Sequence, residues 1–400
     1  MQSRILIAGA GIGGLTTALC LAKSGHQVTI FERRDRLEED GAGIQISPNA
    51  SRVLVTLGLE PSLASVAVAA RNLIVRRLSD AHSIARMALN DLTQRYKSPY
   101  WLLRRADLQS ALLAAVNATP GINVDYGRTV DTVQQRPGGL AVSSTTANDT
   151  ARTEETFDLL VGADGLWSSI ADQVDVQGGK PRFTGYEAWR ALLPAENIPP
   201  ALHGPDVALW LGSGTHIVTY PVASGAFLNI VLVREGASAE TGWTRAGNAS
   251  ALSSLLTHAA PDLRRLLEQV TAWQIWSLFD APVRPMASNR IALVGDAAHP
   301  VLPFLAQGAA LAIEDAAALA TRLTHTVLAD ETALTRNLLR YDRERRPRAM
   351  NVQRAARSNG KTYHLGWPAS LVRDQAMSLL GGSNLLRRYD WLYGWNHQQL

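Results

Sequence analysis

A glycine-rich turn between two apolar strands constrains the fold of this 400-residue chain more than any other feature. Arg4 to Ala8 is a short apolar run typical of a buried parallel strand, and Gly9-Ala10-Gly11-Ile12-Gly13-Gly14 follows it directly. Leu15 to Lys23 then has helical spacing, and Gln27 to Glu32 forms the next apolar run. Because parallel strands need a crossover helix, the segment predicts a βαβ unit.

The glycines of this turn match what binding of a dinucleotide requires. Gly9 permits the tight turn, Gly11 lets the backbone approach a pyrophosphate, and Gly14 lets helix and strand pack closely. The helix N-terminus offers free N–H groups to the anion. Glu32 comes 18 residues after Gly14, where an acid accepts ribose hydroxyls. FAD and NAD both use this frame, and a glycine-rich turn without a ligand is the alternative.

Two further apolar strands each end in a small residue and an aspartate. The first runs from Asp158 through Asp164-Gly165, with Ser168 behind it, and the second runs from Arg290 through Gly295-Asp296-Ala297-Ala298-His299-Pro300. Open α/β sheets bind ligands at the carboxyl ends of their strands, where a carboxylate can accept hydrogen bonds from sugar or ribityl hydroxyls. Taken singly, each aspartate is explained equally well as a helix N-cap.

Together the three motifs resemble the FAD-dependent aromatic hydroxylases, the para-hydroxybenzoate hydroxylase family of single-component flavoprotein monooxygenases. The resemblance runs from Ile5 to about Arg348 and looks closest to the salicylate hydroxylase and 3-hydroxybenzoate 6-hydroxylase branch. The segments that carry it, besides the three motifs, are Gly41-Ala42-Gly43-Ile44-Gln45, Leu103-Arg104-Arg105-Ala106-Asp107-Leu108, Gly185-Tyr186-Glu187-Ala188-Trp189-Arg190, Ala306-Gln307-Gly308, Glu314-Asp315 and Tyr389-Asp390-Trp391-Leu392-Tyr393-Gly394-Trp395.

The resemblance implies an α/β fold, with a Rossmann-like FAD-binding domain, an inserted β-sheet substrate domain and a C-terminal helical segment. The FAD-binding domain is expected to be discontinuous, built from residues 1–70, 98–180 and 278–345. Residues 71–97 and 181–277 would form the substrate domain, and residues 346–400 the helical cap. From the local pattern, residues 73–95 read as irregular strands and loop, and residues 122–160 as short antiparallel strands.

The resemblance also implies which residues hold FAD. Glu32 and Arg33 are expected near the adenosine ribose, Arg105 near the phosphates and ribityl chain, and Asp296 on the ribityl hydroxyls. Asp164 lies in a motif near both FAD and the pyridine nucleotide. The expected cofactor-binding residues are Gly9, Gly11, Gly13, Gly14, Glu32, Arg33, Gly43, Arg105, Asp164, Asp296, Pro303, Gly308 and Ala309.

Gly308 and Ala309 would open the helix that faces the isoalloxazine ring. The positive end of a helix dipole there stabilises a reduced flavin by about 0.3–1 kcal/mol when exposed, and by up to about 2 kcal/mol when buried. The chain departs from the family pattern at Ala171, where an arginine usually follows the D-G motif. It also has Pro303 where the 3-hydroxybenzoate enzymes have glutamine.

His216 and Tyr220 are the candidate catalytic residues. Residues four apart in a strand share one face, and their Cβ atoms are about 13 Å apart, which is enough to bracket one aromatic ring. Related hydroxylases have the same His-x-x-x-Tyr spacing as substrate contact and base. With an ordinary pKa of about 6.5, a histidine could accept a phenolic proton. From the spacing alone, a histidine and a tyrosine in a sheet core explain the pattern as well, and the base could be another group.

The implied activity is hydroxylation of an activated aromatic ring, such as a hydroxybenzoate, salicylate or hydroxypyridine carboxylate, with O2 and NAD(P)H through a flavin C4a-hydroperoxide. Only one dinucleotide fingerprint occurs, and FAD fills it in this family, so NADH or NADPH would bind transiently as co-substrate. An NAD-dependent dehydrogenase leaves the two aspartate motifs unexplained. A non-catalytic flavin-binding redox sensor is the alternative of another class, and its NADH oxidation would not respond to an aromatic substrate.

The composition limits the other partners. A single cysteine, Cys20, and nine histidines without paired spacing give no expected metal site. No run of 18 apolar residues occurs, so we expect no membrane span and a cytoplasmic protein. Residues 336–361 have nine basic residues against two acidic ones, which suggests either a nucleic-acid patch or a solvated helix. No aromatic residues interleave with the arginines, which favours the helix and no nucleic acid. A homodimer is compatible with the sequence, which does not decide the oligomeric state.

Overall fold

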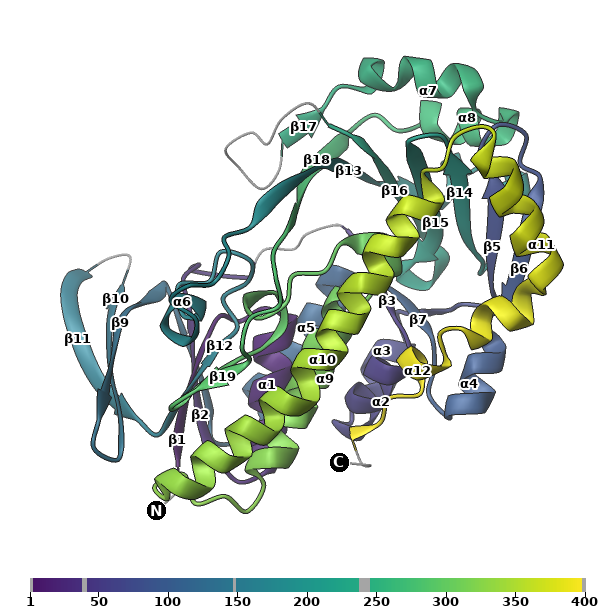
Figure 1. The fold of residues 1–400 in the computed structure, drawn as a ribbon. Helices are drawn as coiled ribbons and strands as arrows, with labels where there is room; N and C mark the ends of the chain where they lie inside the picture. Colours follow the sequence, from purple (N-terminus) through teal and green to yellow (C-terminus); the bar gives the residue numbers. More distant parts are fainter. Residues whose placement is uncertain (1–2, 38–41, 147–148, 237–244, 398–400) are drawn as a thin grey trace.

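Two large sheets organise the chain. The computed structural model describes residues 3–37, 42–146, 149–236 and 245–397. A six-stranded, mainly parallel sheet occupies the lower half of Figure 1, and an eight-stranded, mainly antiparallel sheet occupies the upper half. The long helix α10 (Glu331–Tyr363) runs from the first sheet to the second. The predicted α/β fold class is therefore confirmed.

The six-stranded sheet is built from segments far apart in the sequence. Its spatial order is β19 (Ala287–Ser288), β20 (Ile291–Leu293), β12 (Leu159–Gly162), β1 (Arg4–Ala8), β2 (Gln27–Glu32) and β8 (Ile122–Tyr126). All neighbours pair in parallel except the edge strand β19. The expectation of antiparallel strands throughout residues 122–160 was wrong for β8, because its register with β2 makes it a parallel edge strand.

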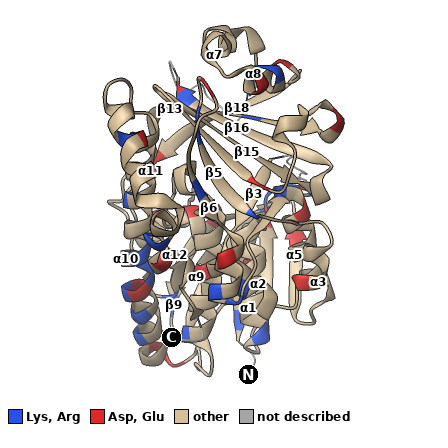
Figure 2. Cartoon of the chain, turned by 90° about the vertical axis from the view of Figure 1, so that its right-hand side faces the viewer, with Lys and Arg blue, Asp and Glu red and all other residues tan. Residues whose placement is uncertain are grey.

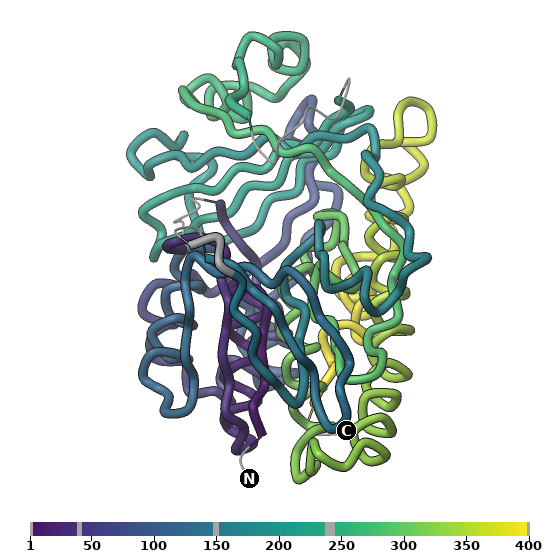
Figure 3. Tube along the Cα trace, turned by 90° about the vertical axis from the view of Figure 1, so that its left-hand side faces the viewer, coloured from purple at the N-terminus to yellow at the C-terminus, as the bar shows by residue number. Residues whose placement is uncertain are grey.

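Both faces of this sheet are covered, which explains its continuous apolar strands. Helices α1 (Ile12–Lys23), α5 (Arg105–Ala118) and α9 (Gly308–Leu323) pack on one face. A three-stranded sheet of β9 (Arg128–Arg136), β10 (Gly139–Thr146) and β11 (Asp149–Phe157) lies beside the other face, and Figure 3 shows it in front of β1 and β2. Phe31 and Phe157 join the two layers, with ring centroids 6.2 Å apart.

The eight-stranded sheet takes its strands from two stretches of the chain. Its spatial order is β17 (Arg245–Gly247), β18 (Trp273–Asp280), β13 (Arg182–Pro194), β16 (Phe227–Glu235), β15 (Thr215–Val222), β14 (Val207–Gly212), β5 (Asn72–Arg77) and β6 (Ser83–Ala88). Helices α7 (Ser253–His258) and α8 (Pro261–Glu268) cover its outer face (Figure 2), against a core that includes Trp210 and Ile217. Its inner face packs in a second core, which includes Tyr220 of β15, Leu311 of α9 and Val352 of α10.

Smaller elements connect the two halves. A three-stranded sheet of β3 (Gly43–Ile46), β7 (Trp101–Arg104) and β4 (Val68–Ala69) lies between them with α2 (Pro48–Thr56) and α3 (Glu60–Ala64). The helix α4 (Asn90–Tyr96) replaces part of the loop expected at residues 73–95. After α10 the chain forms α11 (Ala369–Arg387), which packs on β6, and the short helix α12 (Asp390–Tyr393).

Candidate functional site

The glycines between β1 and α1 differ in what surrounds them. Gly9 has φ +106°, and a Cβ on it would lie 2.5 Å from the carbonyl oxygen of Ala163. A Cβ on Gly14 would overlap the carbonyl oxygen of Gly9, while a Cβ on Gly11 would have no atom within 4 Å. Gly9 and Gly14 therefore serve the turn itself, and Gly11 borders open space from which a ligand could approach the helix N-terminus.

Two other expected glycines are explained by packing. A Cβ on Gly13 would lie 3.2 Å from Cβ of Ala312, so Gly13 allows α1 to contact α9. The amide of Gly43 donates to Oδ1 of Asn229 at 2.7 Å, which ties β3 to β16 of the upper sheet. Gly41, which belongs to the same motif, lies outside the described residues.

Glu32 ends β2 beside the glycine-rich turn. Its carboxylate accepts hydrogen bonds from the amides of Ala10 (2.8 Å) and Arg34 (3.0 Å), and its side chain is buried. The acid therefore holds the turn to the second strand. Arg33 is exposed next to it.

The carboxylate of Asp164 forms hydrogen bonds within its own loop. Oδ1 accepts from the hydroxyl of Ser168 at 2.5 Å, and Oδ2 accepts from the amide of Ser169 at 2.9 Å. Burial raises the pKa of Asp164 while the hydrogen bond from Ser168 lowers it. These bonds close the loop that leads into α6 (Ala171–Val174), whose first amide donates to the hydroxyl of Ser168, so Asp164 supports its own loop without being the helix N-cap.

Asp296 is the one exposed residue in the buried turn 294–300. Its side chain makes no hydrogen bond within the described residues. The protein around it raises the pKa of its carboxyl, while His299 and Arg105 attract the charged form and lower it. Arg105, at the first turn of α5, is thus close enough to act on Asp296.

The rest of this turn is anchored to α9. Asp315 accepts from the amide of Gly295 at 3.0 Å and from Nε of the buried Arg345 at 2.8 Å. Its neighbour Glu314 binds Arg348 and the amide of Asn49. Sequence reasoning did not assign roles to these arginines, although a buried Glu-Asp pair needs cations. Arg345 and Arg348 belong to the basic segment 336–361.

The start of α9 is open in the way a ligand would require. A Cβ on Gly308 would meet nothing within 4 Å, and Ala309 is half-buried. The side-chain amide of Gln307 donates to the hydroxyl of Ser47 at 3.0 Å and accepts from the side-chain amide of Asn49 at 3.0 Å. The half-buried Pro303 begins the short 3-10 helix η6 (Pro303–Leu305) before it.

The inner face of the eight-stranded sheet contributes His216 and Tyr220, both buried on β15. Burial lowers the pKa of His216 to about 3, with a smaller contribution from His364. Nδ1 of His216 lies 2.8 Å from Nε2 of His364. Burial also raises the pKa of Tyr220, whose hydroxyl is hydrogen-bonded to Gln45. His216 is therefore neutral, which corrects the expected pKa near 6.5, and Tyr220 stays protonated.

Sequence reasoning missed His364, Gln45 and Tyr100 at this face. The hydroxyl of Tyr100 donates to Oε1 of Gln45 at 2.8 Å, so Gln45 links Tyr100 to Tyr220. Gln45 lies in a segment that the resemblance included, and its place there was the available signal. His364 follows α10 and has no local pattern that points to His216.

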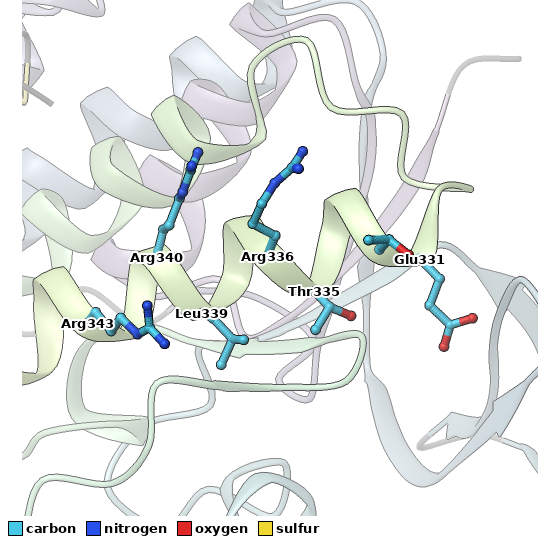
Figure 4. A pocket seen from close by; sticks show the side chains of 7 residues that line it. Glu331, Thr335, Arg336, Leu339, Arg340 and Arg343 are labelled. Carbon is cyan, nitrogen blue, oxygen red and sulfur yellow. The ribbon is translucent and has the colours of Figure 1, made fainter.

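A hollow on the outside of α10 belongs to none of these motifs. Figure 4 shows its lining, which includes Arg336, Arg340 and Arg343. Within the basic segment, Arg345, Arg348 and Arg357 form ion pairs with other parts of the chain. The segment is thus a helix with one solvated face and one face packed against the protein, as the helix interpretation predicted.

The residues present fit a flavin dinucleotide. The open space at Gly11, the exposed carboxylate of Asp296 in a buried turn and the open N-terminus of α9 could receive a pyrophosphate, a ribityl chain and a reduced ring, respectively. Among the described residues, no group of three His, Cys, Asp or Glu side chains could hold a metal ion. None of the helices in the described part of the chain is long and apolar enough to cross a membrane.

Comparisons with known proteins agree with this geometry. A family model described as "FAD binding domain" matches residues 2–356. The 3-amino-4-hydroxybenzoate 2-monooxygenase of Streptomyces cremeus is 36% identical over 394 residues, covering 98% of this chain and 95% of the relative. The 3-hydroxybenzoate 6-hydroxylase of Klebsiella oxytoca is 31% identical over 394 residues, covering 98% and 96%. A solved salicylate hydroxylase substrate complex has the same fold, with a TM-score of 0.83 at 24% identity, covering 100% and 97%.

Proposed function

This chain belongs to the FAD-binding-domain family of flavoprotein aromatic hydroxylases, and we propose that its substrate is a benzoate ring carrying a phenolic hydroxyl. It is an FAD-dependent monooxygenase that uses NAD(P)H and O2. The relatives named above are hydroxylases, which favours this activity over a dehydrogenase or a non-catalytic sensor. The substrate class is inferred from the inner face of the eight-stranded sheet.

The observation that carries the substrate class is the arrangement of Arg190, His216 and Tyr220. The register pairs Arg190 with Val231 of β16, and Val231 with Val218 of β15. Val218 lies between His216 and Tyr220, so Arg190 faces the middle of that pair across two strand spacings, about 10 Å. The three polar groups thus surround an apolar floor of the two valines, of a size that fits one benzoate.

Each polar group suits one part of such a ring. The guanidinium of Arg190 lies 4.9 Å from the ring centroid of Trp276, which orients it, and it is the group that suits a carboxylate. Tyr220 accepts a hydrogen bond from Gln45, so its own proton can be donated to the substrate. Neutral His216 can accept the phenolic proton at Nε2. We propose these residues as the substrate site.

When bound and reduced by NAD(P)H, FAD would supply the chemistry that activates O2 and transfers one oxygen atom to the ring. The residues of the glycine-rich turn, Glu32, Arg105, Asp296 and the start of α9 would hold it below the sheet. The sheet would hold the ring and keep water out. By accepting the phenolic proton, it would also make the ring richer in electrons. We propose that the chain is divided into three parts. Residues 1–70, 98–180 and 278–345 bind FAD, residues 71–97 and 181–277 bind the substrate, and residues 346–400 form a helical cap.

The test is a comparison of ring substrates. Purified protein is assayed for oxidation of NADH and of NADPH with 3-hydroxybenzoate, salicylate and 3-amino-4-hydroxybenzoate, and with phenol as the ring without a carboxylate. We expect a hydroxybenzoate to stimulate oxidation and to yield a hydroxylated product, and phenol to do neither. Stimulation by phenol alone, or by none of the four, would contradict the proposal.

A variant tests the role of Arg190 directly. Arg190→Met should raise the KM for the hydroxybenzoate roughly ten- to hundredfold, because a hydrogen bond to a charged group is lost. Arg234→Met is the matched control, since Arg234 lies over Trp189 on the outer face of the same sheet. An equal KM in both variants would place the carboxylate elsewhere.

A cytoplasmic location and a homodimer are further proposals, and size-exclusion chromatography with light scattering tests the second.

A further inference from the structure

A second histidine lies directly behind the proposed proton acceptor. Nδ1 of His216 is 2.8 Å from Nε2 of His364, and the rings are 5.0 Å apart between centroids. The backbone fixes His364 from two sides, because its amide donates to the carbonyl of Gly360 and its carbonyl accepts from the amide of Gly214. The contact thus joins the end of α10 to β15 across 148 residues of sequence.

The pair has one free nitrogen at each end. The inner nitrogens share a single hydrogen bond, so one ring donates and the other accepts. Nε2 of His216 has no partner among the described residues. Nδ1 of His364 has no partner there either. Two imidazoles bonded in this way can pass a proton from the outer nitrogen of one to the other ring.

The surroundings of the pair are aromatic. Phe304 and Tyr363 contact the ring of His216, and Tyr186 and Phe304 contact that of His364. Burial raises the pKa of Tyr363, so it stays neutral. The nearest charged groups of α11, Arg373 and Asp374, form an ion pair, and Arg373 also binds the carbonyls of Thr362 and Tyr363. Within the described chain, no carboxylate acts on either imidazole.

Burial differs between the two rings, and this difference gives the pair a direction. His216 is 2% exposed, whereas His364 is half-buried. A positive charge costs less where more water reaches it, so an imidazolium is less unfavourable on His364. Burial lowers the pKa of His364 to about 4 and that of His216 to about 3, which has the same order.

We propose that His364 is a positioning residue that acts through His216 by taking over the phenolic proton of the substrate. The phenolic O–H bond breaks and an N–H bond forms at Nε2 of His216. The N–H bond at Nδ1 of His216 breaks and an N–H bond forms at Nε2 of His364. The proton returns along the same path to the ring oxygen once the new hydroxyl is in place, so the pair ends each cycle unchanged. The inference rests on the proposed function, since it needs a phenolic substrate.

His364→Gln separates proton transfer from orientation. The amide oxygen of glutamine can still accept the Nδ1–H of His216, but it cannot take up a proton. We expect the rate of hydroxylation to fall about 10²-fold near pH 6 with KM unchanged, and hydroxylated product per NADH consumed to fall with it. The loss should shrink as the pH rises, and a ring-fluorinated hydroxybenzoate that is already ionised should be hydroxylated nearly as well as by the wild type. His82→Gln, on an exposed turn, is the control.

The outcomes separate this inference from the proposed function. A wild-type protein that hydroxylates no hydroxybenzoate contradicts the function, whatever the variant does. A working wild type with His364→Gln unchanged, or impaired equally at every pH and with both substrates, overturns the relay alone. Imidazole 15N spectra of the substrate-free protein give an independent readout: between pH 8 and 4 the first proton should appear on His364, and its appearance on His216 would overturn the relay.

Discussion

Nε2 of His299 lies 2.5 Å from Oδ2 of Asp315, and both side chains are buried. The same oxygen accepts from the amide of Gly295, so one carboxylate holds both ends of the turn that presents Asp296. Burial alone would raise the pKa of Asp315, but His299 and Arg345 hold it at about 2. The histidine of the G-D-A-A-H-P motif is therefore a structural partner of α9.

Loss of this carboxylate should be costly. Asp315→Asn removes the counter-charge of His299 and one of the two buried carboxylates that pair with Arg345, leaving only Glu314, and breaking a buried pair costs about 3–5 kcal/mol. Urea unfolding at pH 7 measures the change. Arg265→Gln breaks an exposed ion pair with Asp262 and should change stability by less than about 1 kcal/mol. A similar loss of stability in both variants would show that the buried cluster stabilises the fold no more than an exposed ion pair does.

Gly11→Val should fold without FAD. The added side chain meets no protein atom within 4 Å of its Cβ, but it occupies the space through which a pyrophosphate would approach. We expect a colourless protein with the circular dichroism of the wild type, measured beside its flavin absorbance. Gly14→Ala is the contrasting variant, because its Cβ overlaps the carbonyl oxygen of Gly9 and should prevent folding. Full flavin content in Gly11→Val would remove the turn from the cofactor site.

Asp296→Ala should bind FAD roughly ten- to hundredfold more weakly. The exposed carboxylate is the acceptor proposed for the ribityl hydroxyls, and such a bond contributes about 1.5–3 kcal/mol. Fluorescence titration of the apoprotein with FAD gives the Kd. Asp296→Asn keeps an acceptor oxygen, so its Kd for FAD should lie between those of the wild type and Asp296→Ala. An unchanged Kd in both variants would make Asp296 a residue of the turn alone.

His216→Ala should keep FAD and lose hydroxylation. Removing the group that accepts the phenolic proton lowers the rate by about 10²–10⁴, while NADH oxidation continues and yields H2O2. Tyr220→Phe should be milder, because the hydroxyl only orients the ring. The ratio of product to NADH, with H2O2 measured in parallel, distinguishes the two. Full coupling at the wild-type rate in His216→Ala would mean that His216 and Tyr220 only pack in the sheet core.

Acid should destabilise the protein through His216. Its pKa is about 3 in the fold against an ordinary value of 6.5, so the unfolded chain binds the proton first. The contribution of this histidine to stability is therefore complete above pH 6.5 and decreases as the pH falls toward 3. Urea midpoints at pH 7.5 and 5 should differ more for the wild type than for His216→Gln. Equal differences would mean that His216 is not buried as a neutral ring.

Local motifs were predictable because their constraints lie within a few residues. The apolar runs of β1 and β2, the positive φ of Gly9 and the turn around Asp296 follow from side-chain size and backbone geometry over short stretches. The sheet partner of β8 could not be predicted in this way. A strand of mixed burial fits an antiparallel edge as well as a parallel one, and only its contact with β2 decides.

The sequence by itself determined the glycine-rich βαβ unit and the strand that carries His216 and Tyr220, since each depends on periodicity and on residues near one another in the chain, and its resemblance to a known family implied the fold class. Tertiary structure decided that Asp164 supports its own loop, that Arg345 neutralises Asp315 and that His364 meets His216. The contacts of Arg345 and His364 join different elements that meet only in the folded chain, whereas the bonds of Asp164 stay within one loop. Their energies depend on burial and on distances of about 3 Å, which no local pattern of residues specifies.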